Sequence, residues 1–96
     1  MGLIVQKFGG TSVKDRDRIF NVARIVANTR NQGNDVVVVV SAQGDTTDDL
    51  ITKAAEITSD PSHREMDMLL ATGEQISISL LAMALQEIGV PSGSLT

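Results

Sequence analysis

The sequence contains no cysteine and only one histidine, His63. Without cysteine, the chain can form no disulfide, no thiolate nucleophile and no cysteine-based zinc site. A single histidine also argues against a histidine-rich metal site and against a Ser-His-Asp triad. We therefore expect no metal ion held by the protein's own side chains, and we interpret His63 as a surface residue in a polar connector.

Basic residues are also scarce, because eight Lys and Arg stand against twelve Asp and Glu, for a net charge of −4. A general nucleic-acid or anionic-membrane binder needs a dominant basic face, which this balance argues against. The first ten residues lack the long apolar core and small-residue cleavage site of a signal peptide. No apolar run approaches the roughly 20 residues that span a bilayer. These absences predict a cytoplasmic protein that binds neither nucleic acid nor membranes.

The chain is short, and its composition is ordinary for a soluble globular protein. It has 96 residues, of which 42% are apolar and 21% charged. This length allows one domain at most, or part of one.

The first half of the chain has the pattern of a βαβ unit. Residues 3–8 (LIVQKF) predict a strand that ends at a glycine pair. A helix follows, capped by Ser12 or Asp15, and a turn over 31–34 leads to a continuous β-branched run over 35–41, which predicts a strand buried on both faces of a parallel sheet. The helix places one apolar face at i, i+3, i+4, i+7 and i+8: Ile19, Val22, Ala23, Val26 and Ala27. The crossover is expected to be right-handed.

The second half predicts a polar loop over 41–50 and then helices. Thr46 or Thr47 is expected to cap a helix that faces inward through Leu50, Ile51, Ala54 and Ile57. Residues 58–65 are interpreted as a connector, and a short helical piece then runs up to Gly73.

A longer helix is predicted over 74–88, with one apolar stripe made of Ile78, Leu81, Ala82, Leu85 and Ile88. Gly89 and Pro91 form a helix stop, and residues 90–96 can begin a third strand. Two parallel strands cannot bury both faces and both edges of a sheet by themselves. The organisation therefore indicates the first third of a larger α/β domain.

The first polar cluster, KFGGTS, follows the first predicted strand, at the end where open α/β sheets bind ligands. Gly9 and Gly10 would let the backbone approach an anion, and the ammonium of Lys7 could reach a phosphate. The cluster matches neither the Walker pattern nor GxGxxG. A plain turn beside a solvated lysine explains the same residues.

The second cluster, SAQGDTTDD, follows the second predicted strand and combines hydroxyls with carboxylates. Helix capping by threonine and compensation of the helix dipole by aspartate explain it equally well. A third segment, ATGEQIS, places Glu74 after a glycine at an expected helix start, which is again an ordinary capping arrangement.

Three motifs, in this order and spacing, resemble the aspartate kinases of the amino-acid kinase superfamily: KFGGTSV, VVSAQGDTTDDL and REMDMLLATGEQIS. The resemblance extends from Val5 to Thr96 and implies a three-layer αβα sandwich with a mainly parallel sheet. It identifies residues 1–96 as the N-terminal portion of an amino-acid kinase catalytic domain, without the regulatory ACT domains that family members carry. Members of the family also continue with the adenine and ribose site.

The resemblance implies transfer of the ATP γ-phosphoryl group to the β-carboxylate of L-aspartate, which yields 4-phospho-L-aspartate in the first step of lysine, threonine and methionine biosynthesis. Mg²⁺ would arrive with ATP, and the full-length enzyme would be a homo- or hetero-oligomer. The family's phosphate-binding turn falls on Lys7, Phe8, Gly9 and Gly10, with Ser12 near the reacting groups and Lys7 as the catalytic residue. Its substrate-binding residues fall on Ser41, Thr47 and Glu74. Glu74 suits the α-amino group of aspartate, because an ammonium pairs with a carboxylate.

Two alternatives accompany this interpretation. Another acid kinase of the superfamily, such as one acting on acetylglutamate, could use a similar turn, although acetylglutamate has no free ammonium for Glu74. The chain could also be a non-catalytic assembly piece whose apolar helix over 74–88 docks onto a partner. In either case we expect these 96 residues to be inactive alone, because the nucleotide base site and several aspartate contacts are missing.

Overall fold

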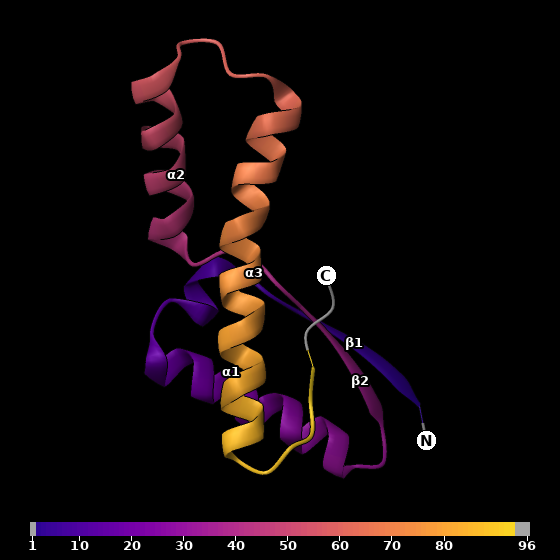
Figure 1. Cartoon of the computed structure of the whole chain (residues 1–96). Coiled ribbons are helices and arrows are strands. Elements are labelled where there is room, and N and C mark those ends of the chain that lie inside the picture. Colours follow the sequence, from indigo (N-terminus) through magenta and orange to yellow (C-terminus); the bar gives the residue numbers. More distant parts are fainter. Residues whose placement is uncertain (1, 94–96) are drawn as a thin grey trace.

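The computed structural model describes residues 2–93 and has the α/β architecture expected from the sequence (Figure 1). The elements are β1 (Leu3–Phe8), the 3₁₀ helix η1 (Gly10–Val13), α1 (Arg16–Asn31), β2 (Asp35–Val40), α2 (Gly44–Ile57) and α3 (His63–Glu87). Residues 90–93 form no strand, and the rest of the predicted third strand lies outside the described residues.

The two strands pair in parallel, and α1 connects them, so the predicted βαβ unit is confirmed. The register runs from Leu3 opposite Asp35 to Phe8 opposite Val40. Of the two candidate caps for α1, Asp15 is the correct one, because its side chain accepts a 2.9 Å hydrogen bond from the backbone N–H of Arg18.

The hydrophobic core lies between one face of the sheet, α1 and the C-terminal half of α3. Its buried members among the described residues are Val13, Ile19, Val22, Ala23, Val26, Val40, Leu81, Ala84, Leu85 and Val90. The predicted apolar face of α1 is thus confirmed, with Ala27 partly buried beside the others.

The expectation that β2 is buried on both faces is wrong. Burial alternates along the strand, and Val37 and Val39 are 43% and 46% exposed, whereas Val40 is buried. Successive side chains of a strand point to opposite faces. Because α1 and α3 both pack on the face that carries Val40, no described residue covers the other one.

Residues 63–87 form one continuous helix, so the predicted connector up to residue 65 and the break at Gly73 are wrong. α3 begins after Ser62, whose side chain accepts a 3.3 Å hydrogen bond from the N–H of Glu65. A glycine inside a helix costs only about 1 kcal/mol relative to alanine. Packing of the helix outweighs that cost, since Gly73 is buried.

α2 begins at Gly44, earlier than expected, so the predicted caps Thr46 and Thr47 lie inside its first turn and make no capping hydrogen bond. The polar loop after β2 is correspondingly short, at residues 41–43. The inward face predicted for α2 is only partly formed, because Leu50 and Ala54 are half-buried while Ile51 and Ile57 are exposed. The reason is that α2 packs mainly against α3, in a hairpin that projects from the rest of the molecule (Figure 1).

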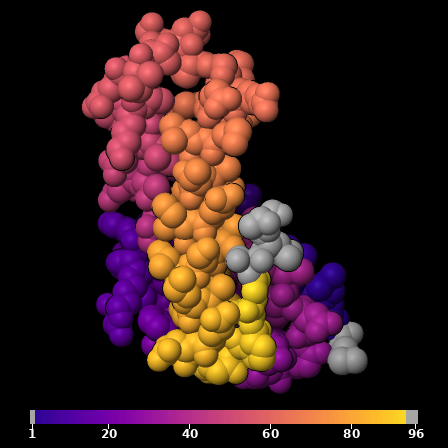
Figure 2. Space-filling model, in the orientation of Figure 1, coloured from indigo at the N-terminus to yellow at the C-terminus, as the bar shows by residue number. Residues whose placement is uncertain are grey.

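The molecule is elongated, with extents of 49 × 25 × 17 Å, and the α2–α3 hairpin forms its protruding end (Figure 2). Its radius of gyration is 15.2 Å. A compact domain of the same length has a radius of gyration of about 12.5 Å. The described residues therefore pack less compactly than a self-sufficient domain.

α3 contains an 18-residue window with a mean hydropathy of 1.5, so by length and composition it could cross a membrane. Inspection of apolar runs missed this property because Thr72, Glu74 and Gln75 interrupt the run. The core helix of a soluble protein passes the same test, and α3 contributes Leu81 and Leu85 to the core.

The predicted helix stop after α3 is confirmed and takes the form of a Schellman motif. The N–H of Val90 donates to the carbonyl of Leu85 at 2.8 Å, and the N–H of Gly89 donates to that of Gln86 at 3.0 Å. Gly89 has φ of +87°, a conformation that side chains with a Cβ rarely adopt.

Gly89→Ala is therefore expected to lower the free energy of unfolding by about 1 kcal/mol, the cost of a left-handed residue with a Cβ. Urea unfolding of the purified chain, followed by circular dichroism at 222 nm, measures this change. Gly93→Ala is the matched control, since its φ is not positive and an added Cβ meets no atom within 4 Å. Equal midpoints for the two variants would contradict the prediction.

Candidate functional site

The turn after β1 packs directly against the loop after β2. A Cβ added to Gly10 would lie 2.6 Å from the carbonyl oxygen of Ala42 and 3.2 Å from the nitrogen of Gly44. The N–H of Ser41 donates to the carbonyl of Phe8 at 3.1 Å, and Nε2 of Gln43 donates to that of Val13 at 2.9 Å. The first two motifs are thus joined through backbone contacts and the side chain of Gln43.

The third motif reaches the same loop from α3. A Cβ added to Gly73 would lie 3.0 Å from Cβ of Ala42 and 3.3 Å from Cγ2 of Thr46. Ala42 consequently lies between Gly10 on one side and Gly73 on the other. Segments far apart in the sequence therefore converge on one loop, and the absence of a side chain at both glycines permits their close approach.

The residues predicted to bind phosphate surround the end of β1. Lys7 is exposed on the face of the sheet that no described residue covers, opposite Val39, whereas Phe8 is half-buried and packs on the core. The backbone around Gly9 is open, because an added Cβ meets no atom within 4 Å. Ser12 is half-buried in η1, where its N–H donates to the carbonyl of Gly9 at 3.1 Å.

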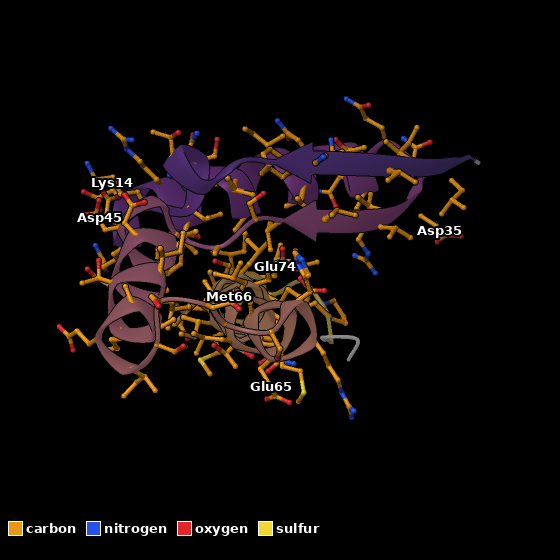
Figure 3. The ribbon with its side chains drawn as sticks, turned by 90° about the horizontal axis from the view of Figure 1, so that it is seen from above. Lys14, Asp35, Asp45, Glu65, Met66 and Glu74 are labelled. Atoms are coloured by element: carbon orange, nitrogen blue, oxygen red, sulfur yellow. The ribbon has the colours of Figure 1, made fainter. Side chains whose placement is uncertain are left out.

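The residues predicted to bind substrate belong to the loop and to the two helices that it meets. Ser41 and Thr47 are half-buried. Glu74 is exposed and follows Gly73, on the side of α3 that faces the sheet, while Glu65 lies on the far side (Figure 3).

Two of these residues, Thr47 and Glu74, do not cap a helix, although the sequence allowed that explanation for both. Thr47 does not cap α2, and Glu74 lies in the interior of α3 rather than at a helix start. A role in helix capping therefore accounts for neither side chain.

Lys7 and Glu74 take part in no ion pair with the residues described. The ion pairs in this part of the chain join Arg16 to Asp17 at 3.3 Å and Arg18 to Asp15 at 3.8 Å, and all four side chains are exposed. Over residues 2–93, no three His, Asp or Glu side chains gather closely enough to hold a metal ion. The predicted site residues thus include one cation, one carboxylate and hydroxyls, but Lys7 projects from the face of the sheet that no described residue covers, whereas Glu74 stands on α3, which packs on the other face.

Sequence reasoning missed the residues that hold the motifs together. No sequence pattern singles out Arg18, yet one of its guanidinium nitrogens donates to the carbonyl of Thr11 at 3.1 Å and so braces the turn after β1. Ala42 is not singled out either, and the sequence pattern predicts a helix break at Gly73 rather than a packing contact. A glycine inside an otherwise helical pattern was the available signal, because such a glycine often has a packing reason.

Residues 2–96 match the model of the amino acid kinase family. The chain belongs to that family. Within it, the chain is 62% identical to an aspartokinase of Geobacillus stearothermophilus over 96 residues and 62% identical to one of Bacillus sp. strain MGA3. It is 58% identical to aspartokinase 2 of Bacillus subtilis strain 168.

A crystal structure of aspartate kinase from Synechocystis shares the fold of this amino acid kinase chain. The TM-score is 0.94 at 58% sequence identity over 97% of the chain, which confirms the expected fold class. The chain covers 16% of that structure's chain, and 23% and 24% of the Bacillus sp. strain MGA3 and Geobacillus proteins. It therefore corresponds to about a quarter of the curated relatives' length.

Proposed function

We propose that these residues form the phosphate side and part of the aspartate pocket of an enzyme that phosphorylates the β-carboxylate of L-aspartate with ATP, giving 4-phospho-L-aspartate. The observation that carries the proposal is the convergence of the three motifs on the loop at Ala42. High identity to proteins named aspartokinase over all 96 residues supports the choice of substrate.

Phosphoryl transfer asks little covalent chemistry of a protein, because it depends on alignment of the reactants and on neutralisation of developing charge. Lys7 is the side chain suited to that neutralisation, since it is exposed at the strand end and engaged in neither ion pair. The open backbone at Gly9 leaves room for a phosphate beside it. Mg²⁺ carried by ATP would add positive charge at the phosphates.

The residues proposed to bind aspartate are assigned from the hydrogen bonds that its charged groups can make. Ser41 and Thr47 carry hydroxyls that can donate to a carboxylate, and Glu74 can accept from the α-ammonium. An acid kinase acting on acetylglutamate would have no use for Glu74 in this role, because the acylated nitrogen carries no charge.

A chimera tests the proposal. This chain replaces the 96 matched residues of the Geobacillus stearothermophilus aspartokinase, with which it is 62% identical. We expect the chimera to consume ATP in the presence of aspartate, with no response to acetylglutamate, whereas the isolated chain shows no turnover. A hydroxamate assay that traps the acyl phosphate measures both. A folded chimera that is inactive with aspartate would overturn the proposal, and turnover by the isolated chain would overturn the expected inactivity.

A further inference from the structure

Gly73 is the point at which α3 meets both the loop after β2 and the start of α2 (Figure 1). A Cβ added to it would lie 3.0 Å from Cβ of Ala42, 3.3 Å from Cγ2 of Thr46 and 3.5 Å from Cδ1 of Leu50. Non-bonded carbon atoms are best separated by about 3.5–4.0 Å. The first two distances are shorter, so α3 can lie this close only because residue 73 has no side chain.

Each residue proposed to bind aspartate is the immediate sequence neighbour of a residue at this contact. The three pairs are Ser41 with Ala42, Thr47 with Thr46, and Glu74 with Gly73. Consecutive Cα atoms are joined at a fixed distance of about 3.8 Å, so a displacement at the contact passes directly to the residue beside it. The contact therefore sets how far Glu74 stands from the hydroxyls of Ser41 and Thr47.

The loop that carries Ala42 is held in place on its other side. A Cβ added to Gly10 would lie 2.6 Å from the carbonyl oxygen of Ala42, so the two backbones are already in close contact. The N–H of Ser41 also donates to the carbonyl of Phe8 at 3.1 Å. Because the loop lies between the turn after β1 and α3, a methyl group added at residue 73 would displace α3 rather than the loop.

The C-terminal half of α3 is anchored in the core, so the displacement would fall on the N-terminal half. Leu81 and Leu85 are buried core residues, and Ser77, one turn after the contact, is fully buried. None of residues 63–72 is buried. Glu74 stands where the anchored part of the helix ends, and it would move with the displaced part.

We propose that Gly73 is a positioning residue for aspartate, because the missing side chain keeps Glu74 close enough to Ser41 and Thr47 for all three to hold one aspartate molecule. This inference rests on the proposed function. Hydrogen bonds between an ammonium and a carboxylate are about 2.7–2.9 Å long. A neighbour of the added Cβ has to give by a few tenths of an ångström, which is enough to lengthen such a bond beyond this range. Lys7 lies on the opposite face of the sheet from α3, so the phosphate side is unaffected.

The test introduces Gly73→Ala into the chimera described above and measures kcat and the KM for each substrate. The KM for aspartate is expected to rise about tenfold, since a misplacement of about 1 Å can cost about a hundredfold and this one is smaller. The KM for ATP is expected to stay the same. Ser79→Ala is the matched control, because Ser79 is a small, exposed residue of α3 outside the three motifs. It is expected to leave both KM values unchanged.

Ala42→Gly provides a rescue, because it removes the methyl carbon that would lie 3.0 Å from the added Cβ. In the Ala42→Gly background, Gly73→Ala is expected to raise the KM for aspartate less than about threefold, since substitutions at residues in contact are not additive. Circular dichroism checks that each variant is folded. If the Gly73→Ala chimera is not, Ala42→Ser enlarges the same contact from the loop side and is expected to raise the same KM.

Three outcomes in an active chimera would overturn this inference alone. They are an unchanged KM for aspartate in the Gly73→Ala variant, an equal rise in the Ala42→Gly background, and equal rises in the KM for aspartate and for ATP. A folded chimera that is inactive with aspartate before any substitution would overturn the proposed function, and this inference with it. The two failures are therefore distinguishable.

Discussion

Lys7→Ala, introduced into the chimera described above, is expected to lower kcat by about 10²–10³-fold, the usual cost of removing one group that stabilises charge in a transition state. The KM for aspartate should change little, because Lys7 stands at the end of β1 and belongs to the phosphate side of the proposed site. Steady-state kinetics with both substrates varied separates the two parameters.

Lys53→Ala provides the control for this substitution, since Lys53 is an exposed lysine on α2 outside the three converging motifs. Thermal unfolding should be similar for both variants, because neither lysine is buried. An unchanged kcat in the Lys7 variant, or a change only in the KM for aspartate, would show that Lys7 does not stabilise the transition state.

Gly10→Ala is expected to destabilise the isolated chain by about 1–3 kcal/mol, the range for forcing extra atoms into a packed interior. The new Cβ would lie 2.6 Å from the carbonyl oxygen of Ala42, which belongs to the backbone and cannot rotate away. Hydrogen bonds from Ser41 to Phe8 and from Gln43 to Val13 hold the two segments together around the contact. Urea unfolding measures the loss.

The adjacent glycine is a matched control with the opposite expectation. Gly9 has φ of −79° and an added Cβ meets no atom within 4 Å, so Gly9→Ala should change stability by less than about 0.5 kcal/mol. In the chimera, however, the methyl group would occupy the space proposed for a phosphate and should lower activity. Equal stability losses at the two positions would contradict the backbone contact between Gly10 and Ala42.

Local sequence patterns predicted most of the secondary structure correctly. Both strands, the parallel unit, the cap at Asp15 and the stop at Gly89 follow from side-chain spacing and from backbone preferences within a few residues. The errors at Gly73 and Thr47 arose because capping signals were read without their tertiary context. A glycine inside a long helix looks like a break until the neighbour that it contacts is known.

The βαβ unit follows from the sequence alone, and so does the resemblance of the three motifs to a known family, which implies the residues proposed to bind phosphate and aspartate. The folded chain was needed to show that Gly10 and Gly73 meet at Ala42, and that α1 and α3 pack on the same face of the sheet. The physical reason is the range of the interactions involved. Spacing and capping act between near neighbours along the chain, whereas the approach of two backbones and the coverage of a sheet depend on contacts between segments distant in sequence.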